Sequence, residues 1–279
     1  MLRPPVSTPN GHSERFTTPA LGEVHLRTVH YGGDPASTLV LLHGGGGNAH
    51  WWDHLAPQLA EQRRVVALDF RGHGDSDYPD DLERGAFDRD LEGLLEHLGV
   101  SDPALFGHSM GAHVAVRFAA AHPSTRALIA LEISRGATRR DRRFARLALA
   151  ARRTYRSRDE ALRRYRFLPD APGASEGLRL HIAKHSVRQE ADGRFGFKFD
   201  ARWFGLPASP PVDLATVACP TLIVRGSRST LLPAEGAASL AEKIPDTRVI
   251  EIEGGGHNVH LERPAEVLQA VEGFLSGLP

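Results

Sequence analysis

Residues 104–122 read ALFGHSMGAHVAVRFAAAH, and this stretch decides the fold. The apolar residues Ala104–Phe106 are typical of a buried strand, and the residues of Met110–His122 have a helical pattern. Between them lies the pentapeptide Gly107–Gly111, which has the pattern G-x-S-x-G with Ser109 at its centre. Glycines on both sides of the serine allow a sharp strand-to-helix turn, which presents the hydroxyl at the carboxyl edge of a sheet. The stretch therefore predicts a nucleophilic serine, and a tight structural turn is the alternative.

A second glycine-rich segment follows an apolar strand earlier in the chain. Leu39–Leu42 leads into His43 and four consecutive glycines, residues 44–47. Glycines let the backbone come close to a ligand and point its N–H groups at it. A phosphate-binding loop is the competing interpretation, but no G-K-[ST] follows and the spacing does not match G-x-G-x-x-G. We expect the N–H groups of Gly45 and Met110 to form an oxyanion hole, and His43 to brace the loop.

A serine hydroxyl needs a base that removes its proton. Of the 15 histidines, His257 stands out because it follows an expected strand across Glu253 and three glycines, in a loop that can reach back to the sheet edge. His260 is the alternative base. We expect His108, inside the serine turn, to pack against the sheet, and His113 to lie on the helix that follows.

Short apolar strands alternate with helical patterns on both sides of the serine turn, which predicts a mainly parallel sheet covered on both faces. The remaining expected strands are Val24–Tyr31, Val65–Phe70, Ala127–Leu131, Thr221–Val224 and Arg248–Ile252, and the remaining expected helices are Trp51–Gln62, Phe87–Leu98, Ala234–Lys243 and Pro264–Leu275. Residues 135–212 interrupt the alternation with arginine-rich helical stretches and no convincing strand. We interpret them as a helical cap inserted into a core of residues 14–134 and 213–279, which a loose tail of residues 1–13 precedes.

Composition excludes several classes of protein. The 279 residues carry 34 Lys and Arg against 34 Asp and Glu, and this zero net charge argues against a nucleic-acid binder. The single cysteine, Cys219, excludes an intrachain disulfide and a cysteine-based zinc site, and we expect it to be a small buried thiol. The chain has no apolar signal segment and no run of 18 apolar residues, so we expect a cytoplasmic protein without a membrane span. The sequence does not indicate an oligomeric state.

Five segments in this order resemble the α/β-hydrolase superfamily over nearly all of residues 15–277. They are LVLLHGGGG from residue 39, VVALDFRGHGDSD from 65, LFGHSMG from 105, CPTLIVRGS from 219 and GGGHNVHLERP from 254. The resemblance implies an α/β-hydrolase fold, a mostly parallel sheet flanked by helices, with a cap insertion. It also implies Ser109 as the nucleophile, His257 as the base, and Gly45 and Met110 as the oxyanion donors. No metal or organic cofactor is needed for such chemistry.

One position departs from the family pattern. Members commonly carry an Asp three residues past a Gly, after the strand that corresponds to Thr221–Val224, but here Gly226 is followed by Ser229 at that spacing. No carboxylate appears before Glu235. Some members place the acid at the end of the preceding core strand, where this chain has Glu132. We therefore predict Glu132 as the acid that orients His257, and we expect Ser229→Ala to be nearly silent.

The cap is strongly basic. Between residues 135 and 202 it holds 17 arginines and two lysines against eight acids. Three interpretations of these arginines are open. They form a solvated surface, or one or two of them point inward to hold a carboxylate or phosphate of the substrate, or they attract an acidic partner or membrane face. Nine apolar and aromatic residues of the cap either line a pocket or form the cap's own core: Phe144, Leu147, Tyr155, Leu162, Tyr165, Phe195, Phe197, Trp203 and Phe204.

Together these features predict a serine hydrolase that cleaves a small or medium ester-like substrate (ester, thioester or lactone) through an acyl-enzyme. The alternatives are other reactions that use the same residues, namely those of a carbon–carbon bond hydrolase, a lyase or a cofactor-free oxygenase. A non-catalytic ligand-binding module is the alternative outside enzymes. We expect the binding partner to be a small-molecule substrate, and the sequence leaves open whether this substrate carries an acid group.

Overall fold

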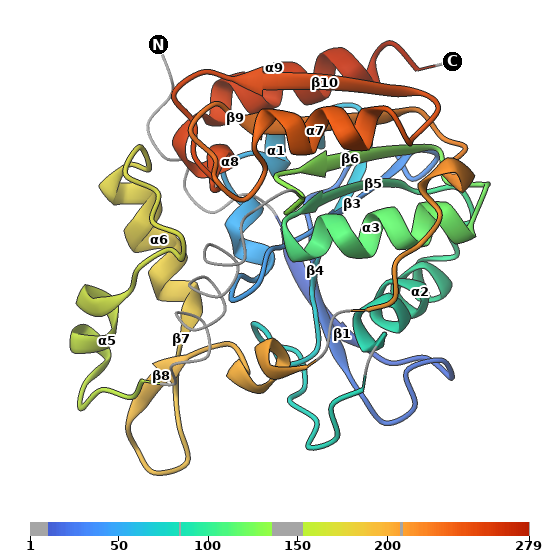
Figure 1. Ribbon diagram of the computed structural model, residues 1–279. Coiled ribbons are helices and arrows are strands. Elements are labelled where there is room, and N and C mark those ends of the chain that lie inside the picture. The colour runs from blue at the N-terminus through green and yellow to red at the C-terminus, as the bar shows by residue number, and fades with distance from the viewer. Residues whose placement is uncertain (1–10, 84, 136–152, 207–208, 279) are drawn as a thin grey trace.

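The computed structural model describes residues 11–83, 85–135, 153–206 and 209–278. Its centre is an eight-stranded sheet with the order β1-β2-β4-β3-β5-β6-β9-β10 (Figure 1). β2 pairs antiparallel with β1 and β4, and every other neighbouring pair is parallel. The strands are β1 (His12–Phe16), β2 (Leu26–His30), β3 (Thr38–Leu42), β4 (Arg64–Asp69), β5 (Ala104–His108), β6 (Ala127–Leu131), β9 (Thr221–Gly226) and β10 (Thr247–Ile252). The mainly parallel sheet predicted from the sequence is therefore confirmed.

The central strands are apolar throughout because helices cover both faces of the sheet. Successive residues of a strand point to opposite faces, so Val40 and Leu42 of β3 pack into one core cluster and Leu39 and Leu41 into the other. The first cluster includes side chains of α2 (Ala86–Leu98), α3 (Met110–Ala121) and α7 (Ala234–Ala241), and the second includes side chains of α1 (Ala56–Leu59), α8 (Val259–Glu262) and α9 (Pro264–Leu275). The sheet edge where β3, β5 and β6 end is thus held rigidly from both sides.

Most of the segment between β6 and β9 forms a separate layer beside the core, whereas its last element packs against α3 (Figure 1). Its elements are α5 (Arg158–Arg164), α6 (Glu176–Ser186), β7 (Val187–Gln189), β8 (Phe195–Phe197), η2 (Ala201–Gly205) and η3 (Leu214–Thr216). The expectation of no strand here was wrong, because β7 and β8 pair as an antiparallel hairpin. Each strand has only three residues, which is too short for an alternating pattern to be visible in the sequence.

Two further boundaries differ from the expectations. The helix expected over Trp51–Gln62 is divided into η1 (Ala49–Trp52) and α1, because Pro57 lacks an N–H and is tolerated only in the first turn of a helix. The expected tail includes the start of β1, since His12 pairs with His30 in the sheet. Residues 1–10 of that tail lie outside the described residues.

Two expectations from composition can be compared with the structure. Cys219 is a buried free thiol, as predicted. Among the described residues, no helix has the length and apolar character that a membrane crossing requires.

Candidate active site

Ser109 lies in the sharp turn between β5 and α3. Its backbone adopts φ +49°, a value that a non-glycine residue rarely takes. A Cβ at Gly107 would lie 2.4 Å from the Gly111 carbonyl oxygen, and one at Gly111 would lie 2.3 Å from the Leu42 oxygen. Both glycines are therefore required for the chain to pass this close to itself. The turn exposes the Ser109 hydroxyl at the carboxyl edge of the sheet.

His257 reaches this hydroxyl from the loop after β10. Its Nε2 lies 3.0 Å from Ser109 Oγ, and its Nδ1 lies 3.0 Å from Glu132 Oε2. A carboxylate oxygen accepts, so Nδ1 carries the proton and Nε2 offers its lone pair to the serine hydroxyl. Burial lowers the pKa of His257 to about 4, which favours the neutral imidazole that a base requires.

Glu132 directly follows β6 and is fully buried. Its backbone has φ +52° and its N–H donates to the Val224 carbonyl of β9, so the side chain is directed across the end of the neighbouring strand. The Gly226 N–H donates to Oε1 at 2.6 Å. Burial raises the pKa of Glu132 to about 8, while the hydrogen bonds from Ser229 and Gly226 and the charge of Arg225 act in the opposite direction.

Ser229 is the residue whose role sequence reasoning missed. Its hydroxyl donates to Glu132 Oε2 at 2.5 Å and accepts the Leu232 N–H at 3.2 Å. Both Ser229 and Glu132 are buried, so the bond is shielded from water. Because of this hydrogen bond, we revise the expectation that Ser229→Ala is nearly silent. The signal was present in the sequence, because Ser229 occupies the position where relatives commonly carry the acid and must lie beside its replacement.

The glycine loop after β3 lies opposite Ser109. Gly45 and Met110 line the same cavity as Ser109, and Met110 is the first residue of α3, where an N–H has no acceptor inside the helix. His43 is fully buried, with Nδ1 2.8 Å from the Gly44 oxygen and Nε2 accepting the Phe70 N–H at 3.2 Å. It therefore ties the loop to the end of β4.

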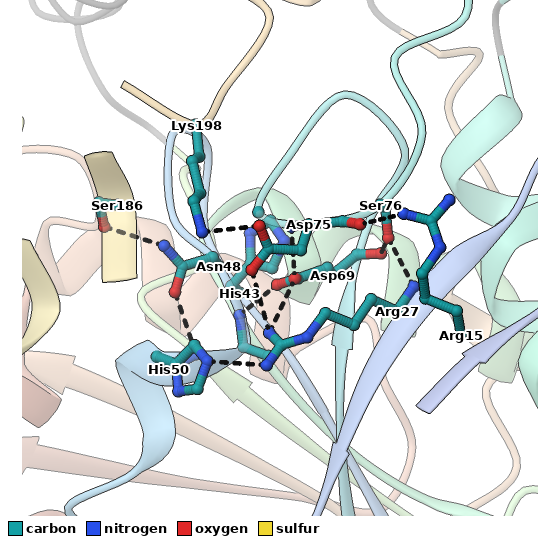
Figure 2. A network of polar contacts seen from close by, with 12 residues as sticks. Arg15, Arg27, His43, Asn48, His50, Asp69, Asp75, Ser76, Ser186 and Lys198 are labelled. Atoms are coloured by element: carbon teal, nitrogen blue, oxygen red, sulfur yellow. Dashed lines mark hydrogen bonds and ion pairs between the residues drawn. The ribbon is translucent and has the colours of Figure 1, made fainter. Parts of the chain in front are cut away.

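Asp69, at the end of β4, also holds this region in place. Its carboxylate accepts the N–H groups of Ala49 at 2.6 Å and Asp75 at 2.9 Å, and Arg27 lies 3.4 Å away (Figure 2). One buried acid thus connects the turn after the glycine loop with the turn after β4.

The other histidines near Ser109 have different surroundings. His260, the alternative base, is fully buried and packs against Trp51, Trp52 and His108, and neither ring nitrogen has a hydrogen-bond partner among the described residues. His108 Nε2 lies 2.9 Å from the His257 carbonyl oxygen, so it contacts the base loop as well as the sheet. His113 lies on α3, where its Nε2 is 3.0 Å from Ser134 Oγ. In contrast to these three histidines, His257 forms a hydrogen bond with Ser109 Oγ.

Ser109 opens onto a cavity of about 590 Å³ between the core and the segment that covers it. Its lining is mainly apolar and includes Trp203 and Phe204, two of the nine residues predicted for a pocket or a cap core. Tyr165 belongs instead to a cluster that the covering segment shares with Trp51 and Leu261 of the core, and Leu162 and Phe197 pack against this cluster. Tyr155 and Phe195 pair with each other through an isolated bridge, and Phe144 and Leu147 lie outside the described residues. Trp203 and Phe204 thus line the pocket, whereas Tyr165, Leu162 and Phe197 help to join the covering segment to the core.

Most of the described cap arginines face solvent. Arg153, Arg156, Arg158, Arg163, Arg164 and Arg166 are all exposed. Arg135 differs because it lines the cavity, and no carboxylate among the described residues pairs with its guanidinium. Arg117, which also lines the cavity, is held by Asp88 at 2.8 Å. One cation without a counter-charge in the described part of the chain thus borders the space in front of Ser109.

Comparisons with known proteins agree with this architecture. The chain is 27% identical over 249 residues to the mouse (Mus musculus) sn-1-specific diacylglycerol lipase ABHD11, covering 85% of this chain and 80% of the lipase. It is 27% identical over 266 residues to the esterase Rv0045c of Mycobacterium tuberculosis, covering 90% and 86%. A crystal structure of an α/β hydrolase from Novosphingobium aromaticivorans superposes with a TM-score of 0.82 at 25% identity, covering 97% of this chain and 99% of that one.

The comparisons support a hydrolase built on this fold, as the resemblance of the sequence implied. The model of the alpha/beta hydrolase family matches residues 39–270, which is most of the chain. The protein therefore belongs to the α/β-hydrolase family.

Proposed function

We propose that the protein is a serine hydrolase that cleaves an ester-like bond of a small or medium substrate. The observation that carries the proposal is the continuous hydrogen-bonded series from Ser109 through His257 to Glu132, with both links at 3.0 Å. A serine alone is a weak nucleophile, and this arrangement supplies a base together with an acid that orients it.

Each residue then has a defined role in the reaction. His257 Nε2 takes the hydroxyl proton as Ser109 Oγ attacks the substrate carbonyl carbon. The N–H groups of Gly45 and Met110 donate to the oxygen, which becomes negative in the tetrahedral intermediate. His257 returns the proton to the leaving alcohol, thiol or ring oxygen, and an acyl-enzyme remains on Ser109. Water, deprotonated by His257, then releases the acid.

The cavity bears on the substrate class. Its apolar walls fit an acyl or alcohol group of medium size, and Arg135 is a cation at the wall without a carboxylate partner among the described residues. The planar guanidinium binds a carboxylate with two parallel hydrogen bonds. We therefore propose substrates that carry a free acid group in addition to the ester-like bond.

The test is active-site labelling with a fluorophosphonate, followed by peptide mapping and a panel of aryl esters, thioesters and lactones. We expect one label on Ser109, which Ser109→Ala abolishes. Ser134 also lines the cavity, and Ser134→Ala is a matched control that keeps the label. Absence of labelling, or a label on Ser134, would refute the proposed nucleophile. Labelling of Ser109 without turnover of any panel member would refute the ester-like substrate and favour the carbon–carbon bond hydrolases.

A further inference from the structure

Four metal-ligating side chains meet at the junction of the core and the cap, away from Ser109. His50 lies in η1 and Asp53 directly follows it, while His181 and His185 belong to α6. One ligand atom of each residue can be chosen so that all four lie within 4.8 Å of one another. Asp53 Oδ2 is central, 2.9 Å from His50 Nδ1 and 2.6 Å from His181 Nε2.

The local structure explains why these side chains converge. His181 and His185 are four residues apart on a helix, so they project from the same face of α6. Asp53 is three positions after His50, and side chains at this spacing overlie each other in a 3₁₀ turn. The side chains of His50 and Asp53 are 12% and 9% exposed, whereas that of His181 is 34% exposed. The cluster is therefore anchored on the core side and open to solvent on the cap side.

Asp53 is oriented by a further residue outside the cluster, as metal-ligating carboxylates usually are. Tyr31 donates its hydroxyl to Oδ1, which leaves Oδ2 for the histidines. A second hydrogen bond that fixes the orientation of a ligating carboxylate in this way is characteristic of metal sites.

The third imidazole, that of His185, lies against the other two rings. The rings of His50 and His185 stack with centroids 3.7 Å apart, and those of His181 and His185 lie 4.8 Å apart. In the described part of the chain, the ring nitrogens of His185 have no hydrogen-bond partner. A network that served only to bind Asp53 would not need this third ring, whereas a metal ion would use it.

We propose that His50, Asp53, His181 and His185 form a binding site for a transition-metal dication, of which Zn²⁺ fits best. Three imidazoles and one carboxylate are ligands that Zn²⁺ prefers, in tetrahedral geometry. With bonds of 2.0–2.1 Å, neighbouring donor atoms of such a site lie roughly 3.3 Å apart. The pairs on Asp53 must separate slightly and His185 must approach, which are small movements of side chains that already face one another.

Arg27 contacts His50, so binding of a metal ion must change the protonation of His50 and the position of Arg27. Its guanidinium lies 3.1 Å from His50 Nε2, and because Arg27 only donates, Nδ1 carries the imidazole proton in the metal-free state (Figure 2). Metal binding at Nδ1 moves that proton to Nε2, and Arg27 turns from His50 toward Asp69 and Asp75, now 3.4 and 3.6 Å away. Asp53, His181 and His185 are thus the primary ligands, and His50 completes the site.

The ion would fasten the cap to the core. Close by, Asn48 donates to Ser186 at 2.9 Å and Lys198 donates to Asp75 at 2.6 Å, and both contacts join the same two layers (Figure 2). Both contacts are polar; the first is buried, and the second is partly open to water. A metal ion with ligands from η1 and α6 would hold the layers together more strongly, next to the glycine loop.

The experiment uses the whole chain, stripped with a chelator and titrated with ZnCl₂ in a calorimeter. We expect one saturable site per chain. At a free Zn²⁺ concentration about 100 times Kd, Tm should rise by roughly 5–10 °C. Bound Co²⁺ should give the intense visible absorption of a four-coordinate site, and this readout needs no variant.

The double variant His181→Gln/His185→Gln should weaken Zn²⁺ binding by at least roughly 100-fold. His12→Gln is the matched control, because His12, Glu14 and His30 form a second group on β1 and β2 that meets the same distance criterion. Circular dichroism establishes that each variant is folded. Absence of a 1:1 site in the parent chain, six-coordinate Co²⁺, or loss of binding in His12→Gln alone would overturn the proposal and leave the four residues as a hydrogen-bond network.

Discussion

The bond from Ser229 to Glu132 provides the sharpest test of the proposed site. The active form needs Glu132 ionised and His257 neutral, because only then does His257 Nε2 accept the Ser109 proton. Ser229 stabilises the ionised carboxylate with a hydrogen bond of 2.5 Å, in a place from which water is excluded. Ser229→Ala removes this donor and leaves no other side chain in its place.

The size of the effect follows from the strength of such a bond. A hydrogen bond to a charged group contributes about 1.5–3 kcal/mol, and 1.36 kcal/mol corresponds to one pKa unit, so the shift is about 1–2 units. Loss of a donor to the carboxylate raises the pKa of Glu132. Burial already raises that pKa and lowers that of His257, and because the two groups lie 3.0 Å apart, the pair titrates as a unit. The acid limb of kcat/KM should therefore move to higher pH.

The assay is the pH dependence of kcat/KM with a neutral aryl ester, measured for the parent chain, Ser229→Ala and Ser227→Ala. Ser227 is a matched control because its hydroxyl accepts the Gly254 N–H and does not contact Glu132. The Leu232 N–H loses its acceptor in Ser229→Ala, so Tm is measured to establish that the variant is folded. An acid limb that stays in place in folded Ser229→Ala, or moves equally in Ser227→Ala, would refute the role of Ser229.

Three further predictions follow from the same geometry. Glu132→Gln keeps the size of the side chain but removes its charge, so kcat should fall by about 10³–10⁴-fold with little change in KM, and an active variant would refute Glu132 as the orienting acid. His257→Ala should lower kcat about as much as Ser109→Ala, and the double variant should be no worse than either single one, because the two residues act as a unit; additive losses would contradict this. Arg135→Gln should abolish a preference in kcat/KM, about 10–100-fold, for substrates with a free acid group over their methyl esters, and equal turnover of both by the parent chain would leave Arg135 without a role in binding.

Much of this molecule could be predicted from local patterns. The core strands are continuous apolar runs because both faces of the sheet are covered, and the glycines at 107 and 111 mark a turn that no larger residue could make. These signals lie within a few neighbouring residues. The family and the mainly parallel sheet followed from them, and the structure places the hydroxyl, ring and carboxyl groups of the three candidate residues in contact. Their catalytic roles remain predictions.

What could not be predicted depends on contacts between distant segments. The hairpin β7–β8 is stabilised by pairing that three-residue strands do not reveal. The cluster of Asp53 with His181 and His185 forms only because α6 packs over η1, and 128 positions separate Asp53 from His181. Nothing in the spacing of these residues indicated that they would meet. The division of the cap's aromatic residues between the cavity and the cluster shared with the core likewise depends on the packing of whole elements.

The fold allows the acid of the proposed site to lie after β6 instead of after β9. β6 and β9 are parallel neighbours, so Glu132, directly after β6, and Ser229, shortly after β9, approach the same point beside His257 Nδ1. A carboxylate from either strand can occupy that point, but two could not, because like charges in a buried place repel. Moving the acid to β6 therefore requires a neutral residue after β9, and a hydroxyl suits best because it donates to the carboxylate. Glu132 and Ser229 are thus one unit, and we expect Glu132→Ser combined with Ser229→Asp to recover part of the activity that Glu132→Ser alone removes.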